Sequence, residues 1–315
     1  MRMLWMLSIL VGVWPSFALA EEQPPSADAA AAHSEAPAPD AAAAHSEAPA
    51  PDAGTPTPAA PTADPVVDAA PRDGLSGRDI YQCVLDNRFS SYIQESRLVS
   101  GDRGDASQES RLEMSWKNWR DEADLAKNGI LSKTIVRYTH PFDLRFSGYL
   151  IVNNEARKND QFVYLAASRR IRRVNLRKEA VFGTDFTFED IVPHEIEDGD
   201  YRRLPDTKIE KSPVYAVEVT PKEHADSEYS RFVVYVEKVS CVPLRTRYWD
   251  DKELEVKELT SPIESVQKFE DVHWPMELTM KNLQLDTFTT LTVQALEPNA
   301  PLRDKEFEVR RLESH

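Results

Sequence analysis

The stretch Trp274-Pro-Met-Glu-Leu-Thr-Met-Lys281 decides the fold class of this 315-residue chain. Its apolar side chains stand at every second position, which is the period of a β-strand that buries one face. Residues 111–117 show the same alternation, with Leu112, Met114 and Trp116 on the apolar side, and residues 232–236 continue it. We predict further strands at 91–99, 134–140, 144–152, 161–166, 169–176, 214–220, 244–249, 253–260 and 287–296.

These segments amount to about ten or eleven strands joined mostly by short polar turns, as in an antiparallel meander. A sheet of that size curls into a barrel or half-barrel to cover its apolar face. Little helix is predicted. Ser76-x-x-Asp79 is a capping box that opens an N-terminal helix, and Thr187-Phe-Glu-Asp190 opens a short one that Pro193 stops. The chain is therefore predicted to be mainly β, with short helices that plug or lid the barrel.

The inner wall of such a barrel would be largely apolar and wide enough to leave a cavity for an apolar ligand. Met suits this role because its flexible side chain adapts to irregular shapes. The alternative is that the same positions fill a close-packed core. The predicted wall residues are Leu112, Met114, Trp116, Phe232, Val234, Val236, Trp274, Met276, Leu278 and Met280.

The chain divides into three parts by composition. Residues 1–20 carry one basic residue, a short apolar run and an Ala18-Leu-Ala20 end, which predicts a cleaved signal peptide and export rather than a lipid or membrane anchor. Residues 21–71 are Ala/Pro-rich and acidic and contain a 12-residue repeat, which predicts a disordered spacer. Residues 72–315 are the folded domain, with 37 basic and 44 acidic side chains. This acidic balance argues against a nucleic-acid partner.

The sequence lacks the motifs of common catalytic and metal sites, such as G-x-S-x-G, H-E-x-x-H and C-x-x-C. Its histidines are dispersed, and its acidic residues between 189 and 200 fit a solvated face better than a general acid/base pair. We therefore predict no enzyme activity, no cofactor and no metal. Among the basic residues 169–178, structural ion pairs are the first interpretation, and contact of Arg169 and Arg173 with anionic lipid head groups is the second. Cys83 and Cys241 fit either a disulfide, which the oxidising compartment of an exported protein would permit, or two buried thiols.

Several stretches resemble one bacterial family. They are Lys133-Thr134 to Tyr138, Pro141-Phe-Asp-Leu-Arg145, Phe162-Val-Tyr-Leu165, Arg169-x-x-x-Arg173 and above all Gly183-Thr-Asp-Phe-Thr-Phe-Glu-Asp190. The chain from 75 to 312 is similar to the outer membrane lipoprotein-sorting protein family, in the branch of uncharacterised treponemal-type domains. This branch is related in fold to the lipoprotein carrier LolA and the receptor LolB.

The resemblance implies an unclosed antiparallel β-barrel with a helical lid and a cavity that holds acyl chains. We expect Gly183 to supply a backbone angle that other residues avoid, Asp185 or Thr187 to cap the lid helix, and Phe186 and Phe188 to anchor it. The signature also contains Thr184, Glu189 and Asp190, and the competing interpretation makes its acids catalytic.

Three functions fit these observations. The first is a monomeric periplasmic carrier that shields the acyl chains of a lipoprotein or lipid on the way to the outer membrane, with an inner-membrane transporter or outer-membrane receptor as partner. The second is a lipid-binding accessory of a membrane exporter of hydrophobic compounds. The third is an enzyme that modifies envelope lipids or glycans.

Overall fold

The computed structural model describes residues 73–104, 106–120 and 129–313, which lie within one compact unit formed by 63–315. The predicted signal peptide and spacer lie outside the described residues. None of the helices in the described part of the chain is long and apolar enough to cross a membrane.

Among the described residues the single α-helix is α1, which runs over Gly77–Asp86 and begins where the sequence predicts. Ser76 is its N-cap: the Asp79 backbone N–H donates to the Ser76 hydroxyl, and the Asp79 carboxylate accepts from the Ser76 backbone N–H at 2.9 Å. This reciprocal capping box satisfies N–H groups that have no partner inside the helix. Ile80 and Tyr81 point from α1 into the core and are buried.

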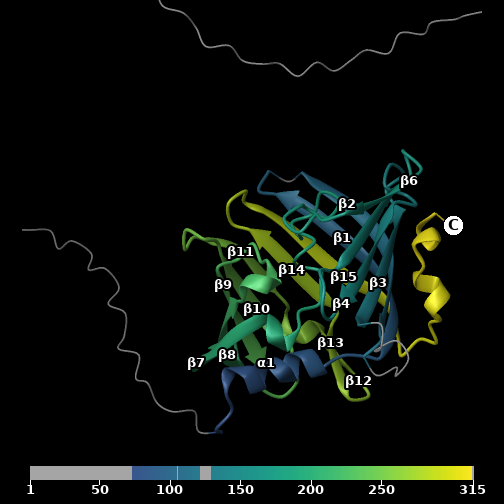
Figure 1. Cartoon of the computed structure of the whole chain (residues 1–315). Helices are drawn as coiled ribbons and strands as arrows, with labels where there is room; N and C mark the ends of the chain where they lie inside the picture. The colour runs from purple at the N-terminus through teal and green to yellow at the C-terminus, as the bar shows by residue number, and fades with distance from the viewer. Residues whose placement is uncertain (1–72, 105, 121–128, 314–315) are drawn as a thin grey trace, which may run out of the picture. The chain divides into compact units, whose positions relative to one another are not determined.

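Thirteen strands form one antiparallel sheet in the order β6-β5-β4-β3-β2-β1-β15-β14-β11-β10-β9-β8-β7, and β12 and β13 form a separate hairpin (Figure 1). Among the described residues the edge strands β6 and β7 do not pair, so the barrel is unclosed, as the resemblance implies. The strands are β1 Ser91–Asp102, β2 Ser107–Asn118, β3 Ile130–His140, β4 Gly148–Asn154, β5 Asp160–Leu165, β6 Arg170–Val174, β7 Gly199–Ile209, β8 Ser212–Pro221, β9 Arg231–Glu237, β10 Pro243–Trp249, β11 Glu255–Thr260, β12 Val266–Phe269, β13 Val272–Pro275, β14 Glu277–Asn282 and β15 Thr287–Pro298.

The number of strands is larger than predicted, in part because the stretch 274–281 is not one strand. Trp274 belongs to β13 and pairs with Gln267 of β12, whereas Leu278 belongs to β14 and pairs with Leu291 of β15. The chain changes sheet at Met276, whose backbone N–H donates to Ser265 O at 3.0 Å. An alternation of apolar residues does not reveal such a change, because both strands keep the same period.

Different segments cover different parts of the sheet. The inner face of β7–β10 packs against α1, and Cys83 of α1 forms a disulfide with Cys241 in the β9–β10 turn, so the disulfide alternative is the one realised. On the outer face, the C-terminal 3-10 turns η4 (Asp304–Phe307) and η5 (Val309–Leu312) pack Phe307 and Leu312 against the side of β3–β5 that carries Ile135 and Leu150. The inner face of β1–β5 is covered by residues 176–193, which we call the lid.

The prediction of a short helix in the lid is wrong. Residues 180–192 form turns, with one isolated bridge between Ala180 and Thr187. Asp190 accepts a hydrogen bond from the Thr187 backbone N–H at 2.7 Å, as in half of a capping box, but no helix follows. A helix of a few residues is not stable by itself, and packing of the apolar side chains decides the backbone instead. Gly183 has φ of +79°, the left-handed conformation expected of it, although a Cβ there would meet no atom within 4 Å.

Candidate functional site

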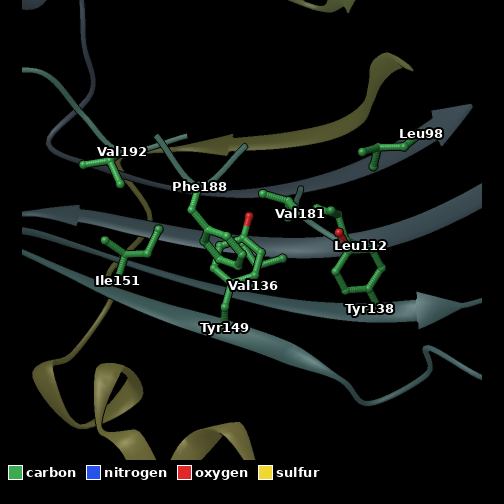
Figure 2. Close-up of a cluster of buried hydrophobic side chains, with 9 residues drawn as sticks. All are labelled: Leu98, Leu112, Val136, Tyr138, Tyr149, Ile151, Val181, Phe188 and Val192. Atoms are coloured by element: carbon green, nitrogen blue, oxygen red, sulfur yellow. The ribbon is translucent and has the colours of Figure 1, made fainter. Parts of the chain in front are cut away.

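The lid contributes three apolar side chains to a cluster on the inner face of the sheet (Figure 2). Val181, Phe188 and Val192 are buried and point at the side chains of β1–β4. The Phe188 ring meets the Tyr149 ring edge-on, with centroids 5.5 Å apart, and Phe182 stacks on the same tyrosine. The sheet residues of this cluster are Leu98, Leu112, Val136, Tyr138, Tyr149 and Ile151. The lid therefore occupies the apolar inner wall that the sequence assigns to a ligand.

The lid backbone is a self-contained loop. Its backbone-to-backbone hydrogen bonds in the described structure link lid residues to each other, for example Val181 N–H to Phe186 O at 2.8 Å and Phe188 N–H to Glu179 O at 3.1 Å. The segment does not extend any strand of the sheet. Its polar contacts with the rest of the protein are made through side chains, which can separate without disrupting sheet hydrogen bonds. The lid thus has the construction of an Ω-loop, a compact unit that packs its own side chains.

Asp185 fixes the middle of the lid to β15. Its carboxylate accepts hydrogen bonds from the hydroxyls of Thr287 and of Thr289, the latter at 2.7 Å, and its backbone N–H donates to Thr289 Oγ1 at 2.9 Å. Thr289 is fully buried. Asp185 is therefore an attachment point between lid and sheet rather than a helix cap, which corrects the predicted capping role.

Asp190 fixes the end of the lid to the other half of the sheet. Its carboxylate accepts from Lys257 Nζ of β11 at 2.8 Å and from the Tyr229 hydroxyl at 2.7 Å. The exposed fraction is 1% for the Asp190 side chain and 9% for that of Lys257. Both carboxylate oxygens of Asp190 accept hydrogen bonds, and these bonds tie the end of the lid to β11 and to the chain before β9.

Glu189 is also tied to the chain before β9. Its carboxylate accepts from the Ser227 hydroxyl and from the Glu228 backbone N–H, the latter at 2.8 Å. Burial raises the pKa of Glu189 and that of Glu228 above their usual values. Burial and the neighbouring Asp190 carboxylate raise the pKa of Tyr229 far above 10, so its hydroxyl keeps its proton and remains a donor.

The ten predicted wall residues fall into four groups. Leu112 and Met114 lie under the lid, and Phe232, Val234 and Val236 lie under α1. Trp116 and Trp274 pack with Phe89 and Tyr92 between β1, β2 and β13. In β14, Leu278 and Met280 share one face, Met280 being fully buried and Leu278 half-buried, and Met276 is the half-buried residue before it.

A cavity of about 590 Å³ lies beside this wall, and most of the residues that line it are polar or charged. Of the ten predicted wall residues only Phe232 lines it, together with Tyr81, Val192 and Ile196 from the apolar clusters. Its polar lining comes from the β4–β5 turn, the end of the lid and the connection between β8 and β9, and includes Asn153, Lys158, Arg177, Glu189, His194, Glu195, Asp198 and Asp226. The cavity is therefore lined by polar and apolar groups together, and the lid and α1 cover five of the ten predicted wall residues.

Two contacts close this cavity between the lid side and the β8–β9 connection. Lys158 pairs with Asp226 at 3.1 Å, and the Arg177 guanidinium donates to the backbone oxygens of Ala225 and Asp226. Burial raises the pKa of Glu195, which pairs with Arg120, and lowers the pKa of His194.

The basic run is only partly as predicted. Arg173 pairs with Asp160 on the outer face, which is the structural ion pair expected first. Arg169 lies outside β6, in the turn before it, with φ of +49°.

Sequence reasoning missed Lys257 and Tyr229 as partners of the lid. A signal for Lys257 was present in the sequence. Lys257 lies two positions before Leu259 and therefore on the same, inward side of its strand. In the described part of the chain, no group of three or more His, Cys, Asp or Glu side chains is arranged to hold a metal ion.

Comparison with known proteins agrees with this architecture. A family model described as "uncharacterized protein" matches residues 131–314. The chain is similar to the structure of an outer membrane lipoprotein-sorting protein domain from Vibrio parahaemolyticus, with 22% identity and a TM-score of 0.67 over 75% of this chain and 98% of that one. A DUF1329 family protein from Desulfovibrio piger has 21% identity and a TM-score of 0.69, over 75% of this chain and 97% of that one.

A third similar structure is a LolA superfamily protein from Nitrosomonas europaea, with 16% identity and a TM-score of 0.57 over 74% of this chain and 98% of that one. No curated protein matches the sequence. Because the family model spans more than half of the chain, the protein belongs to this family of uncharacterized proteins, and its fold is that of the outer membrane lipoprotein-sorting and LolA superfamily domains.

Proposed function

We propose that the protein is a periplasmic carrier that binds the acyl chains of a lipid or lipoprotein on the inner face of its sheet, by exchange with the lid. One observation carries this proposal: an apolar face of five strands is covered by a loop whose backbone-to-backbone hydrogen bonds are all local. Such a cover can leave without breaking the sheet, and acyl chains would then take the place of the lid's apolar side chains.

The chemistry of the wall supports an acyl ligand. Leu112, Val136 and Ile151 supply flat aliphatic surface, and the rings of Tyr138 and Tyr149 close the sides of the site. Burial of apolar area contributes about 25 cal/mol per Å², so a bound chain that covers the wall as fully as the lid does would offset the loss of lid contacts. The polar cavity beside the lid end would accept the head group or the polypeptide to which the chains are attached.

The proposal assigns binding and not covalent chemistry to this site. The signature acids Asp185, Glu189 and Asp190 each accept hydrogen bonds from at least two partners, which suits attachment of the lid. The place of action follows from the predicted signal peptide and from the similarity to outer membrane lipoprotein-sorting domains. Transport toward the outer membrane is part of the same proposal.

Binding of a fluorescent fatty acid, measured by titration, tests the acyl site with two variants of opposite expected effect. Phe188→Ala weakens the lid's hold on the wall and should tighten probe binding severalfold. Leu278→Asn puts a polar group on the half-buried wall and should weaken binding by about tenfold, the cost of placing an amide against an apolar chain. Val239→Asn, at a residue 83% exposed in the β9–β10 turn, is the matched control and should bind like wild type.

The opposite signs separate a binding effect from general loss of structure, because an unfolded variant would only lose binding. The proposal fails if neither wild type nor Phe188→Ala binds the probe while both retain cooperative thermal unfolding. Native mass spectrometry of the protein recovered from the periplasm would then identify what, if anything, it carries.

A further inference from the structure

Five hairpin turns lie along one end of the sheet. Since the sheet is antiparallel, the β1–β2, β3–β4 and β5–β6 turns share an end. β15 runs antiparallel to β1 and β11 runs antiparallel to β14, so the β14–β15 and β10–β11 turns lie at this end as well. In Figure 1 these turns follow the upper edge of the sheet, away from α1.

This end carries most of the large apolar side chains that the described structure exposes. Six of the eight are here, namely Phe142, Phe146, Leu165, Leu254, Leu283 and Leu285. Phe142, at the β3–β4 turn, is 91% exposed. The opposite end has polar turns such as 155–159, and the other two exposed large apolar residues of the described structure are Val239 in the β9–β10 turn and Leu75 before α1. Isolated apolar residues on a surface need no explanation, but their concentration on neighbouring turns indicates an interaction site.

Charge divides this end into two halves. In the β1–β2, β14–β15 and β10–β11 turns, Arg103 pairs with Asp286 at 2.5 Å, and residues 250–253 contain three acids and one lysine. In the β3–β4 and β5–β6 turns and β6, residues 142–146 and 165–172 contain four arginines and one aspartate. Arg169, Arg170 and Arg172 are exposed and form no ion pair with a described residue.

We propose that residues 142–146 and 165–172, which we call the docking edge, bind the surface of a lipid bilayer that contains anionic lipids. Phe142 and Leu165 would enter the interfacial zone, and the four arginines would meet the phosphates. Separate turn tips that project from the molecule suit a fluid surface, which closes around each of them. A rigid protein partner would need a continuous complementary patch.

Protection of an edge strand is the alternative reason for arginines in β6, because charges on an edge prevent pairing with another sheet. That explanation covers Arg170 and Arg172 but does not require Arg145 or the exposed Phe142 of another hairpin. Phe182 of the lid packs on Tyr138, with ring centroids 4.7 Å apart, and Tyr138 lies near the end of β3 that leads into the β3–β4 turn. A bilayer bound at the docking edge would therefore lie next to the lid.

Cosedimentation with vesicles tests the docking edge, with the full chain purified after export. The vesicles are phosphatidylglycerol with phosphatidylethanolamine, and pure phosphatidylcholine for comparison. Wild type should bind the anionic vesicles at least tenfold more tightly, and binding should fall as salt is raised. A double variant that removes the apolar tips, Phe142→Ser with Leu165→Ser, should reduce binding roughly tenfold. A triple variant that removes the charges, Arg169→Gln with Arg170→Gln and Arg172→Gln, should reduce binding by about fivefold for each arginine.

The matched control is Val239→Ser, which removes an equally exposed apolar side chain from the opposite end and should leave binding unchanged. The proposal is overturned if wild type binds neither vesicle, if Val239→Ser weakens binding as much as the docking-edge variants, or if those variants change only self-association in light scattering. This inference does not depend on acyl binding at the inner wall. Vesicle binding is measured as a function of lipid concentration, and the docking-edge variants leave the inner wall intact.

Discussion

Asp190 of the lid and Lys257 of β11 form an ion pair of 2.8 Å with almost no exposed side-chain surface. They are 67 residues apart in the sequence, and their contact joins the end of the lid to β11 of the sheet. Taking two charges out of water is costly, so such a pair is a weak source of stability but a strong determinant of geometry. Tyr229 and Thr187 complete the hydrogen bonding of the carboxylate, which fixes where the lid ends.

Removing one member of this pair should be more damaging than removing both. Lys257→Met leaves the Asp190 charge buried and should lower the free energy of unfolding by about 3–5 kcal/mol. Lys257→Met combined with Asp190→Asn should recover a large part of that loss, because no uncompensated charge remains. Urea unfolding of the two single variants, the double variant and wild type gives the coupling energy. Additive losses would show that the pair does not act as a unit.

Two residues on one face of β14 report how tightly the wall is packed. Met280 is fully buried, so Met280→Ala should cost about 2–5 kcal/mol of stability. Leu278 is half-buried, and Leu278→Ala should cost about half as much because less apolar area is lost. Thermal and urea unfolding measure both. Equal losses would mean that Leu278 belongs to the closed core and is unavailable to a ligand.

His194 should make the fold sensitive to acid. Its ring packs against Phe232 with centroids 5.8 Å apart, and desolvation holds its pKa below 6.5 against the opposing effect of Asp198 and Asp190. As pH falls through 6.5, the unfolded chain gains a proton at this residue before the folded chain does, so stability decreases.

His194→Gln removes that contribution and should lose less stability than wild type between pH 7 and pH 5. The raised pKa values of Glu189, Glu195 and Glu228 act in the opposite direction, since they favour the folded state below their pKa, but they are present in both proteins and cancel in the comparison. Parallel pH profiles of unfolding for the two proteins would contradict this prediction.

The disulfide should hold α1 against the sheet. Cys83 and Cys241 are separated by 158 residues, and a cross-link over a long segment stabilises mainly by restricting the unfolded chain. Changing both cysteines to alanine should lower the free energy of unfolding by about 2–5 kcal/mol, whereas a reducing agent should then have no further effect. The vesicle binding of the docking edge should stay unchanged, because the edge lies at the end of the sheet away from α1.

Much of the architecture was predictable from local patterns. Alternation around Leu112 and Met114 places strands on one curved sheet, and Ser76 with Asp79 marks the start of α1, because period and capping depend on residues a few positions apart. Gly183 likewise reveals a turn with positive φ. The same local rules failed at Thr187, where a capping box is followed by no helix, since packing of Phe188 on Tyr149 decides the backbone.

The sequence by itself determined the mainly β fold, the helix start and which faces of the strands are apolar. Only the tertiary structure decided that Asp190 meets Lys257 and that the chain changes sheet at Met276. It also decided that most residues lining the cavity are polar, while the apolar inner face of β1–β5 lies under the lid. Each of these depends on the curvature and register of thirteen strands, which bring residues together across long separations that no local period encodes.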